Sequence, residues 1–231
     1  MSGYQDEEKK ALEDIRRWDE ESVVYFSNRR KPLRERNVVK TFLRICGIEF
    51  TNDEVKSCGE DPPDVLFREA RFEVVDLLDK DRERRRQFKE RAVKSKAATS
   101  LAEVCHDLHE EPDERFPLEF PELLGRIEQL IDKKHKKLKS RKDRVVDFGT
   151  LDLLIYVSLE NHHVVPPLRL DCPSQFLTKV RGQGWRSVSF FMNVWAGVIL
   201  SKVDAPNFIK NLKGRPIFVQ DAQVASSLWE N

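Results

Sequence analysis

The chain has 231 residues, of which 35% are charged and 39% are hydrophobic. This length suffices for one sizeable domain with a packed core, and no apolar run approaches the roughly 18 residues that a membrane-spanning helix requires. The N-terminus, MSGYQDEEKK, lacks the apolar segment of a signal peptide. Four widely separated cysteines without a CxxC pair disfavour a structural zinc site or a disulfide framework. These features predict a soluble, cytoplasmic protein with no membrane partner.

The net charge of +1 hides a strong segregation of charge along the chain. Segment 29–44 has seven basic side chains and one acidic one, and segment 80–96 has nine basic and three acidic ones. Segment 133–142 has seven basic side chains and no acidic one. Such basic blocks can bind a phosphate backbone, although charge runs on solvated helix faces are also common. The candidate nucleic-acid contacts are Arg34, Arg36, Arg82, Arg85, Arg86, Lys89, Lys136 and Lys137. We expect DNA rather than RNA as the partner; the oligomeric state stays open, with a dimer as one option.

The first half of the chain predicts helices around one hairpin of strands. Apolar residues recur at helical spacing in 6–27 and 33–46, and Gly47 ends the second helix because glycine tolerates a left-handed conformation. The β-branched and aromatic content of 64–68 and 71–78 predicts two strands joined by a tight turn at Glu69-Ala70.

Further helices are expected at 80–96 and 122–139, with a proline-rich loop or extended connection at 110–122 between them. From residue 145 onward the sequence predicts buried strands. The dense apolar run at 151–159 is typical of a central strand. Segment 188–200 fits one long strand, or two with a break near Ala196-Gly197.

The order of these elements predicts an α/β (α+β) fold in which a mixed central sheet is flanked by helices. We expect a single domain over 1–231. An extra N-terminal helix over 1–30 and a helical insertion over 98–142, with an acidic loop and a basic helix, would be added to it.

Two acidic residues of the predicted hairpin could form a metal site. Asp64 begins one strand and Glu73 lies on the next. With the turn centred on Glu69-Ala70, Asp64 lies across from Val75, which shares a sheet face with Glu73 because side chains alternate along a strand. The two carboxylates can therefore converge at one sheet edge, and Mg²⁺ prefers such oxygen ligands. Otherwise Asp64 simply flanks a strand and Glu73 faces solvent.

The stretch EDPPDVLFREARFEVVDLL at 60–78 resembles the PD-(D/E)xK motif of the restriction-endonuclease-like nucleases. Pro63-Asp64 corresponds to PD, and Glu73-Val74-Val75 corresponds to (D/E)xK. The whole chain is also similar to a family of uncharacterised bacterial proteins described as candidate endonucleases. The resemblance implies a restriction-endonuclease-like core, Mg²⁺ or Mn²⁺ on the two motif acids and phosphodiester hydrolysis of nucleic acid. It also implies an acid from the preceding helix, for which Glu35 is the candidate metal ligand.

The motif departs from the superfamily at one position. Val75 stands where the pattern has lysine, and an isopropyl group can neither position the attacking water nor stabilise developing negative charge. Lys80 is the preferred substitute cation, and Lys89 on the next helix is the second option. Two functions therefore stay open. One is a metal-dependent endonuclease that uses Asp64, Glu73 and Lys80, and the other is a catalytically inactive nucleic-acid-binding or protein-interaction module on the same fold.

Overall fold

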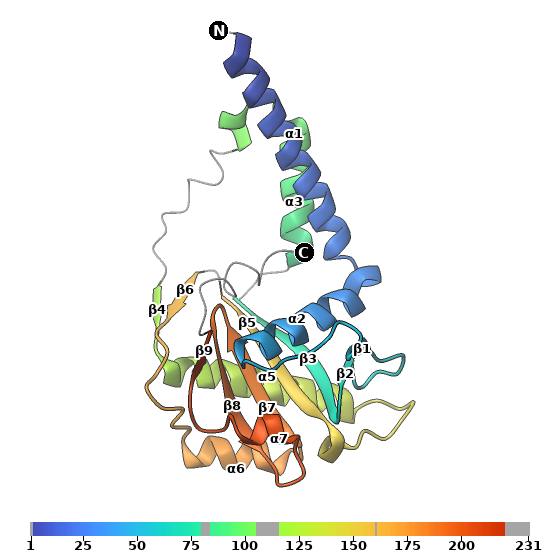
Figure 1. Cartoon of the computed structure of the whole chain (residues 1–231), viewed down its shortest axis with the longest axis vertical. Helices are drawn as coiled ribbons and strands as arrows, with labels where there is room; N and C mark the ends of the chain where they lie inside the picture. Colours follow the sequence, from blue (N-terminus) through green and yellow to red (C-terminus); the bar gives the residue numbers. More distant parts are fainter. Residues whose placement is uncertain (1, 80–83, 105–115, 160, 220–231) are drawn as a thin grey trace. The chain divides into compact units, whose positions relative to one another are not determined.

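The computed structural model describes residues 2–79, 84–104, 116–159 and 161–219 (Figure 1). The chain divides into two compact units, one formed by residues 1–34 and 79–115 and the other by 35–78 and 116–231. This division differs from the expected single domain with an extension at 1–30 and an insertion at 98–142. The physical reason is packing: the N-terminal helix packs on the helix at 84–97, whereas the helix at 120–139 packs on the sheet.

The first unit is an antiparallel pair of helices, α1 (Ser2–Tyr25) and α3 (Arg84–Ala97), with a short 3-10 helix η1 (Asn28–Arg30) after α1. Leu12 of α1 packs in a small buried cluster with Ala98 and Val104. The guanidinium of Arg16 donates hydrogen bonds to the carbonyl oxygens of Ser95 and Ala98, at 3.0 and 2.7 Å. Apolar contacts and capping of the helix end therefore both join α1 to α3.

The second unit is built on a seven-stranded sheet with the order β1-β2-β3-β5-β7-β8-β9. Its strands are β1 (Val55–Ser57), β2 (Val65–Phe67), β3 (Ala70–Leu78), β5 (Asp152–Ser158), β7 (Ser187–Met192), β8 (Trp195–Ser201) and β9 (Ile217–Phe218). Strands β3, β5 and β7 are parallel neighbours, whereas the outer pairs are antiparallel. Strands β4 (Phe116–Leu118) and β6 (His162–Val164) form a separate parallel pair. The mixed sheet that the sequence predicted is confirmed.

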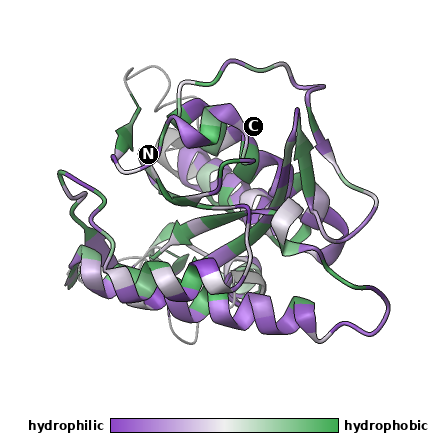
Figure 2. Cartoon of the chain, turned by 90° about the horizontal axis from the view of Figure 1, so that it is seen from below, coloured by the Kyte–Doolittle hydropathy of each residue, from purple (hydrophilic) through white to green (hydrophobic). Residues whose placement is uncertain are grey.

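Helices cover both faces of this sheet (Figure 1). Helices α5 (Phe120–Lys139) and α6 (Ser174–Gly182) lie on one face, and α2 (Lys31–Ile45) and α7 (Asn207–Lys210) lie on the other. A short 3-10 helix, η2 (Phe148–Thr150), precedes β5. Parallel strands need a crossover connection, and α5 and α6 belong to the connections that enter β5 and β7. Figure 2 shows hydrophobic residues concentrated in the central strands and hydrophilic residues along the helices.

Two turns differ from their predicted positions. The hairpin pairs Phe67 with Ala70, so its turn is centred on Arg68-Glu69, one residue earlier than predicted, and Arg68 has a φ of 50°. The break after β7 lies at Asn193-Val194 rather than near Ala196-Gly197, and Asn193 has a φ of 49°. Asparagine tolerates the positive φ that tight hairpin turns require.

Gly197 lies inside β8 for a packing reason. A Cβ atom at this position would lie 2.6 Å from Leu170 Cδ1 and 2.7 Å from Phe190 Cε1. The glycine therefore marks a close contact in the core and not the end of a strand.

Candidate functional site

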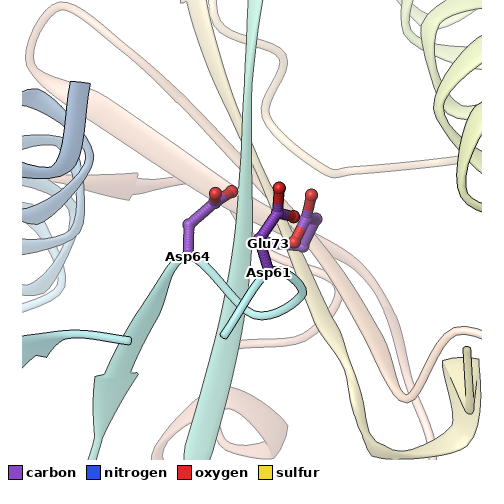
Figure 3. A group of neighbouring side chains, drawn as sticks. All are labelled: Asp61, Asp64 and Glu73. Carbon is purple, nitrogen blue, oxygen red and sulfur yellow. The ribbon is translucent and has the colours of Figure 1, made fainter. Parts of the chain in front are cut away.

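The β2–β3 hairpin and the loop before it bring three carboxylates together (Figure 3). Asp61 lies in the loop between β1 and β2, Asp64 directly precedes β2, and Glu73 lies on β3. One carboxylate oxygen from each lies within 4.8 Å of the others. Among the described residues, this is the one group of three or more potential metal ligands whose ligand atoms lie this close together. The predicted convergence of Asp64 and Glu73 is therefore present in the geometry, and Asp61 joins it.

Backbone hydrogen bonds hold Asp64 against β3. Its N–H donates to the carbonyl oxygen of Phe72 at 2.9 Å, and its Oδ2 accepts the N–H of Val74 at 2.9 Å. The observed register places Asp64 beside Glu73 rather than across from Val75, because the turn lies earlier than predicted. The Asp64 side chain is buried, so its carboxylate is fixed by the backbone of the neighbouring strand.

Glu73 is fully buried, on the face of the sheet that α5 covers. Its neighbours Phe72 and Val74 point to the α2 side, since side chains alternate along β3. The Nζ atom of Lys134, on α5, lies 2.5 Å from Glu73 Oε1, and the lysine side chain is 15% exposed. Neither carboxylate oxygen of Glu73 accepts a hydrogen bond of regular geometry. A buried carboxylate in this state is costly unless a cation lies beside it, and the Lys134 ammonium is that cation.

The surroundings raise the pKa of Glu73 to about 6. Burial is the largest cause because it disfavours the charged form, and the negative charge of Asp64 is the second. The Lys134 ammonium acts in the opposite direction, and Asp61 adds a smaller upward effect. The carboxylate of Glu73 thus needs a positive partner in order to stay ionised near neutral pH.

Arg141, which follows α5, binds the third carboxylate. Its Nη1 donates to the backbone oxygen of Asp61 at 2.9 Å and to Oδ1 at 3.1 Å. The Arg141 pairing therefore holds both the loop backbone and the side chain of Asp61. Three carboxylates against the cations of Lys134 and Arg141 leave the site with a net formal charge of −1.

Other residues predicted for the site lie elsewhere. Glu35 is buried on α2 but is not part of the group formed by Asp61, Asp64 and Glu73. Val75 packs against the apolar core on the α5 side, so the motif position itself carries no charge. Lys80 lies outside the described residues.

The predicted nucleic-acid contacts are divided between the two units. In the first unit, Arg34 donates hydrogen bonds to the carbonyl oxygens of the last residue of α1 and of the second residue after it. Arg86 pairs with an acid on its own helix, and Lys89 is exposed. Arg82 and the side chain of Arg85 lie outside the described part of the chain. In the second unit the predicted contacts are half-buried Arg36 on α2 and exposed Lys136 and Lys137 near the end of α5.

Sequence reasoning missed Asp61, Lys134 and Arg141 as parts of this site. Asp61 stands three positions before Asp64 in the same EDPPD stretch, so its proximity was a readable signal. Lys134 and Arg141 are two of seven basic residues in 133–142, and nothing in that run marks which of them faces the sheet.

Among the residues that the structure describes, no helix is both long and apolar enough to cross a membrane.

Comparisons with known proteins place the chain in a family. A solved structure of a protein of unknown function from Pseudomonas aeruginosa strain PAO1, described as Monooxygenase Superfamily, is similar to the chain with a TM-score of 0.61 and 29% sequence identity. The similarity covers 94% of this chain and 97% of that one. No curated protein matches the chain. The sequence matches one family over residues 7–224. The chain therefore belongs to the family described as "Putative endonuclease, protein of unknown function (DUF1780)".

Proposed function

We propose that the protein is a metal-dependent endonuclease that hydrolyses phosphodiester bonds of nucleic acid and has a restriction-endonuclease-like core. One observation carries this proposal: three carboxylates converge within 4.8 Å at the hairpin that resembles the nuclease motif, and a lysine ammonium lies against the buried one. The family description points to the same class of reaction. The hairpin β2–β3 followed by the parallel strand β5, with α2 before it, also supports such a core.

The residues present suit a divalent ion. Asp61, Asp64 and Glu73 offer only oxygen atoms, which are the ligands that Mg²⁺ and Mn²⁺ prefer. Glu73 in particular has two buried oxygens without a regular hydrogen bond, so an ion bound there would break no such bond and would share the carboxylate with the Lys134 ammonium. A bound ion would polarise a phosphoryl oxygen and lower the pKa of a water.

The charges of the site fit a phosphodiester. Without an ion the three carboxylates, Lys134 and Arg141 sum to −1, which repels an anion. A divalent ion would change this sum to +1, and a phosphodiester group with one negative charge would then neutralise it. Binding of the scissile phosphate at the three carboxylates should therefore depend on the ion, whereas contacts of the strand elsewhere on the protein should not.

Lys134 takes the role that the motif lysine has in the resembling nucleases. Position 75 is apolar, but the ammonium of Lys134 reaches Glu73 from α5 across the same sheet face. An ammonium at this place keeps Glu73 ionised and stabilises negative charge that develops on the phosphate. We therefore assign this role to Lys134, in addition to the Lys80 and Lys89 that the sequence suggested; Lys80 lies outside the described residues.

The test is cleavage of supercoiled plasmid DNA and of labelled RNA with Mg²⁺ or Mn²⁺. Asp64→Asn and Glu73→Gln should abolish cleavage and weaken ion binding by calorimetry while circular dichroism stays unchanged. Glu60→Gln is the matched control, because Glu60 is an exposed acid of the same loop and is not part of the group of three. Failure of the wild-type protein to bind either ion and to cleave either polymer would overturn the proposal.

A second candidate function rests on Val75. Because this residue packs in the core where the motif has a lysine, the fold could serve as a catalytically inactive binding module. Salt-sensitive nucleic-acid binding without any cleavage in the same assays would select this function.

A further inference from the structure

The last turns of α5 and the segment after it carry basic side chains that touch the candidate site at two points. Lys134 contacts Glu73, and Arg141 contacts Asp61. Between and beside these two residues lie five exposed lysines, which we call the lysine track: Lys133, Lys136, Lys137, Lys139 and Lys142. No side-chain ammonium of the track forms an ion pair or hydrogen bond with any residue that the structure describes. The track is therefore positive charge that no residue of the described ranges neutralises.

Helix stability does not account for the lysine track. Cations in the last turn interact favourably with the negative end of the helix dipole, but this effect falls off beyond one turn. Lys133 lies before the last turn and Lys142 lies after the helix. Like charges three or four residues apart, such as Lys133 with Lys136 and Lys137, destabilise a helix. The chain thus retains a repulsive arrangement next to the three carboxylates.

The other two basic blocks are different. In 29–44, Arg34 donates to backbone carbonyls and Lys40 donates to a side-chain amide. In 80–96, Arg86 and Arg91 form ion pairs with acids of the same unit. Several cations of these blocks already have partners in the fold, whereas the ammonium groups of the lysine track have none in the part of the chain that the structure describes. Block 133–142, to which the track belongs, also supplies the two cations, Lys134 and Arg141, that contact carboxylates of its own unit.

We infer that the lysine track binds the sugar-phosphate backbone of a nucleic-acid strand and leads it to the carboxylates, so that the substrate is a polynucleotide and not a mononucleotide or small phosphodiester. This inference rests on the proposed function and adds the surface that binds the strand beside the site. The helical part of the track extends over six residue steps from Lys133 to Lys139, or about 9 Å of helix axis. With one phosphate per roughly 3.4 Å of each strand, about three phosphates would lie against it.

The experiment uses the full chain with Lys133, Lys136 and Lys137 changed to Gln. Binding of a fluorescent 20-base-pair DNA duplex is measured by anisotropy in EDTA at several salt concentrations, so that it needs no metal and no cleavage. The slope of log K against log salt should fall by about 2.7, since each lost phosphate contact removes about 0.9. We expect Kd to rise at least about tenfold at 0.1 M salt.

The matched control is a second triple variant that removes three exposed cations elsewhere in the same unit. Its changes are Lys56→Gln, Lys213→Gln and Arg215→Gln. It should change the slope by less than about 1. Equal losses in the two triple variants, or no loss in the track variant, would overturn the inference.

A second readout separates this inference from the proposed function. Hydrolysis of bis(p-nitrophenyl) phosphate with Mn²⁺ should be the same in the track variant and the wild type, because this diester has a single phosphate and no flanking backbone for the track to bind. A track variant that loses this hydrolysis would contradict the assignment of the lysines to strand binding. If the wild-type protein cleaves neither plasmid DNA nor labelled RNA with either ion, the proposed chemistry fails, while the binding measurement still decides whether the track binds a strand.

Discussion

Lys134→Ala is the change that tests the proposed site most directly. It removes the ammonium that lies 2.5 Å from Glu73 Oε1 and leaves a fully buried carboxylate beside Asp64. The Lys134 ammonium lowers the pKa of Glu73, so its loss should raise that pKa above the present value of about 6. Loss of one such electrostatic group in an active site costs about 10²- to 10³-fold in kcat.

The assay is single-turnover cleavage of a labelled DNA duplex at saturating Mn²⁺, with Mn²⁺ binding measured separately. Lys133→Ala is the matched control, because Lys133 is the adjacent exposed lysine and does not contact the carboxylates. The Lys133→Ala change should weaken duplex binding only and leave the single-turnover rate constant of cleavage unchanged.

Restoring the cation from the motif position makes the test sharper. Val75 lies two residues beyond Glu73 on the same face of β3, about 7 Å along the strand. A lysine at position 75 could therefore present its ammonium to Glu73. Val75→Lys in the Lys134→Ala background should recover at least about tenfold of the lost rate constant. A Lys134→Ala protein that cleaves within twofold of the wild type would refute the reasoning.

The remaining predictions concern pH and stability. Glu73 binds its proton more tightly in the folded state, with a pKa of about 6 against 4.5, so the metal-free protein should lose stability as pH rises through this window. Ion binding needs the deprotonated carboxylate, so Mn²⁺ affinity by calorimetry should fall about tenfold from pH 7 to pH 5; a flat profile would contradict it. Asp152 is fully buried and pairs with Arg186, so Asp152→Ala should cost about 3–5 kcal/mol in urea unfolding. Gly197→Ala should cost about 1–3 kcal/mol in the same measurement, because its Cβ would clash with Phe190; an unchanged midpoint for either variant would refute the corresponding packing argument.

The sequence alone was sufficient to predict the local elements that carry the site. β-branched and aromatic residues with a short turn between them predicted the hairpin, and the hairpin predicted that Asp64 and Glu73 would meet. Both inferences depend on residues close together in the chain, where backbone geometry leaves few alternatives. The register was wrong because Arg68 adopts the positive φ of the turn, which a sequence with no glycine there does not signal.

Long-range packing decided the rest. Lys134 stands 61 positions after Glu73, and only the seating of α5 on the sheet shows which lysine of a seven-cation run reaches the carboxylate. The fixing of Asp61 by Arg141 likewise depends on where the chain goes after that helix leaves the sheet. Local propensity can place acids on a strand. Which cation lies beside a buried acid, however, depends on how helices and strands from distant parts of the chain pack together in the core.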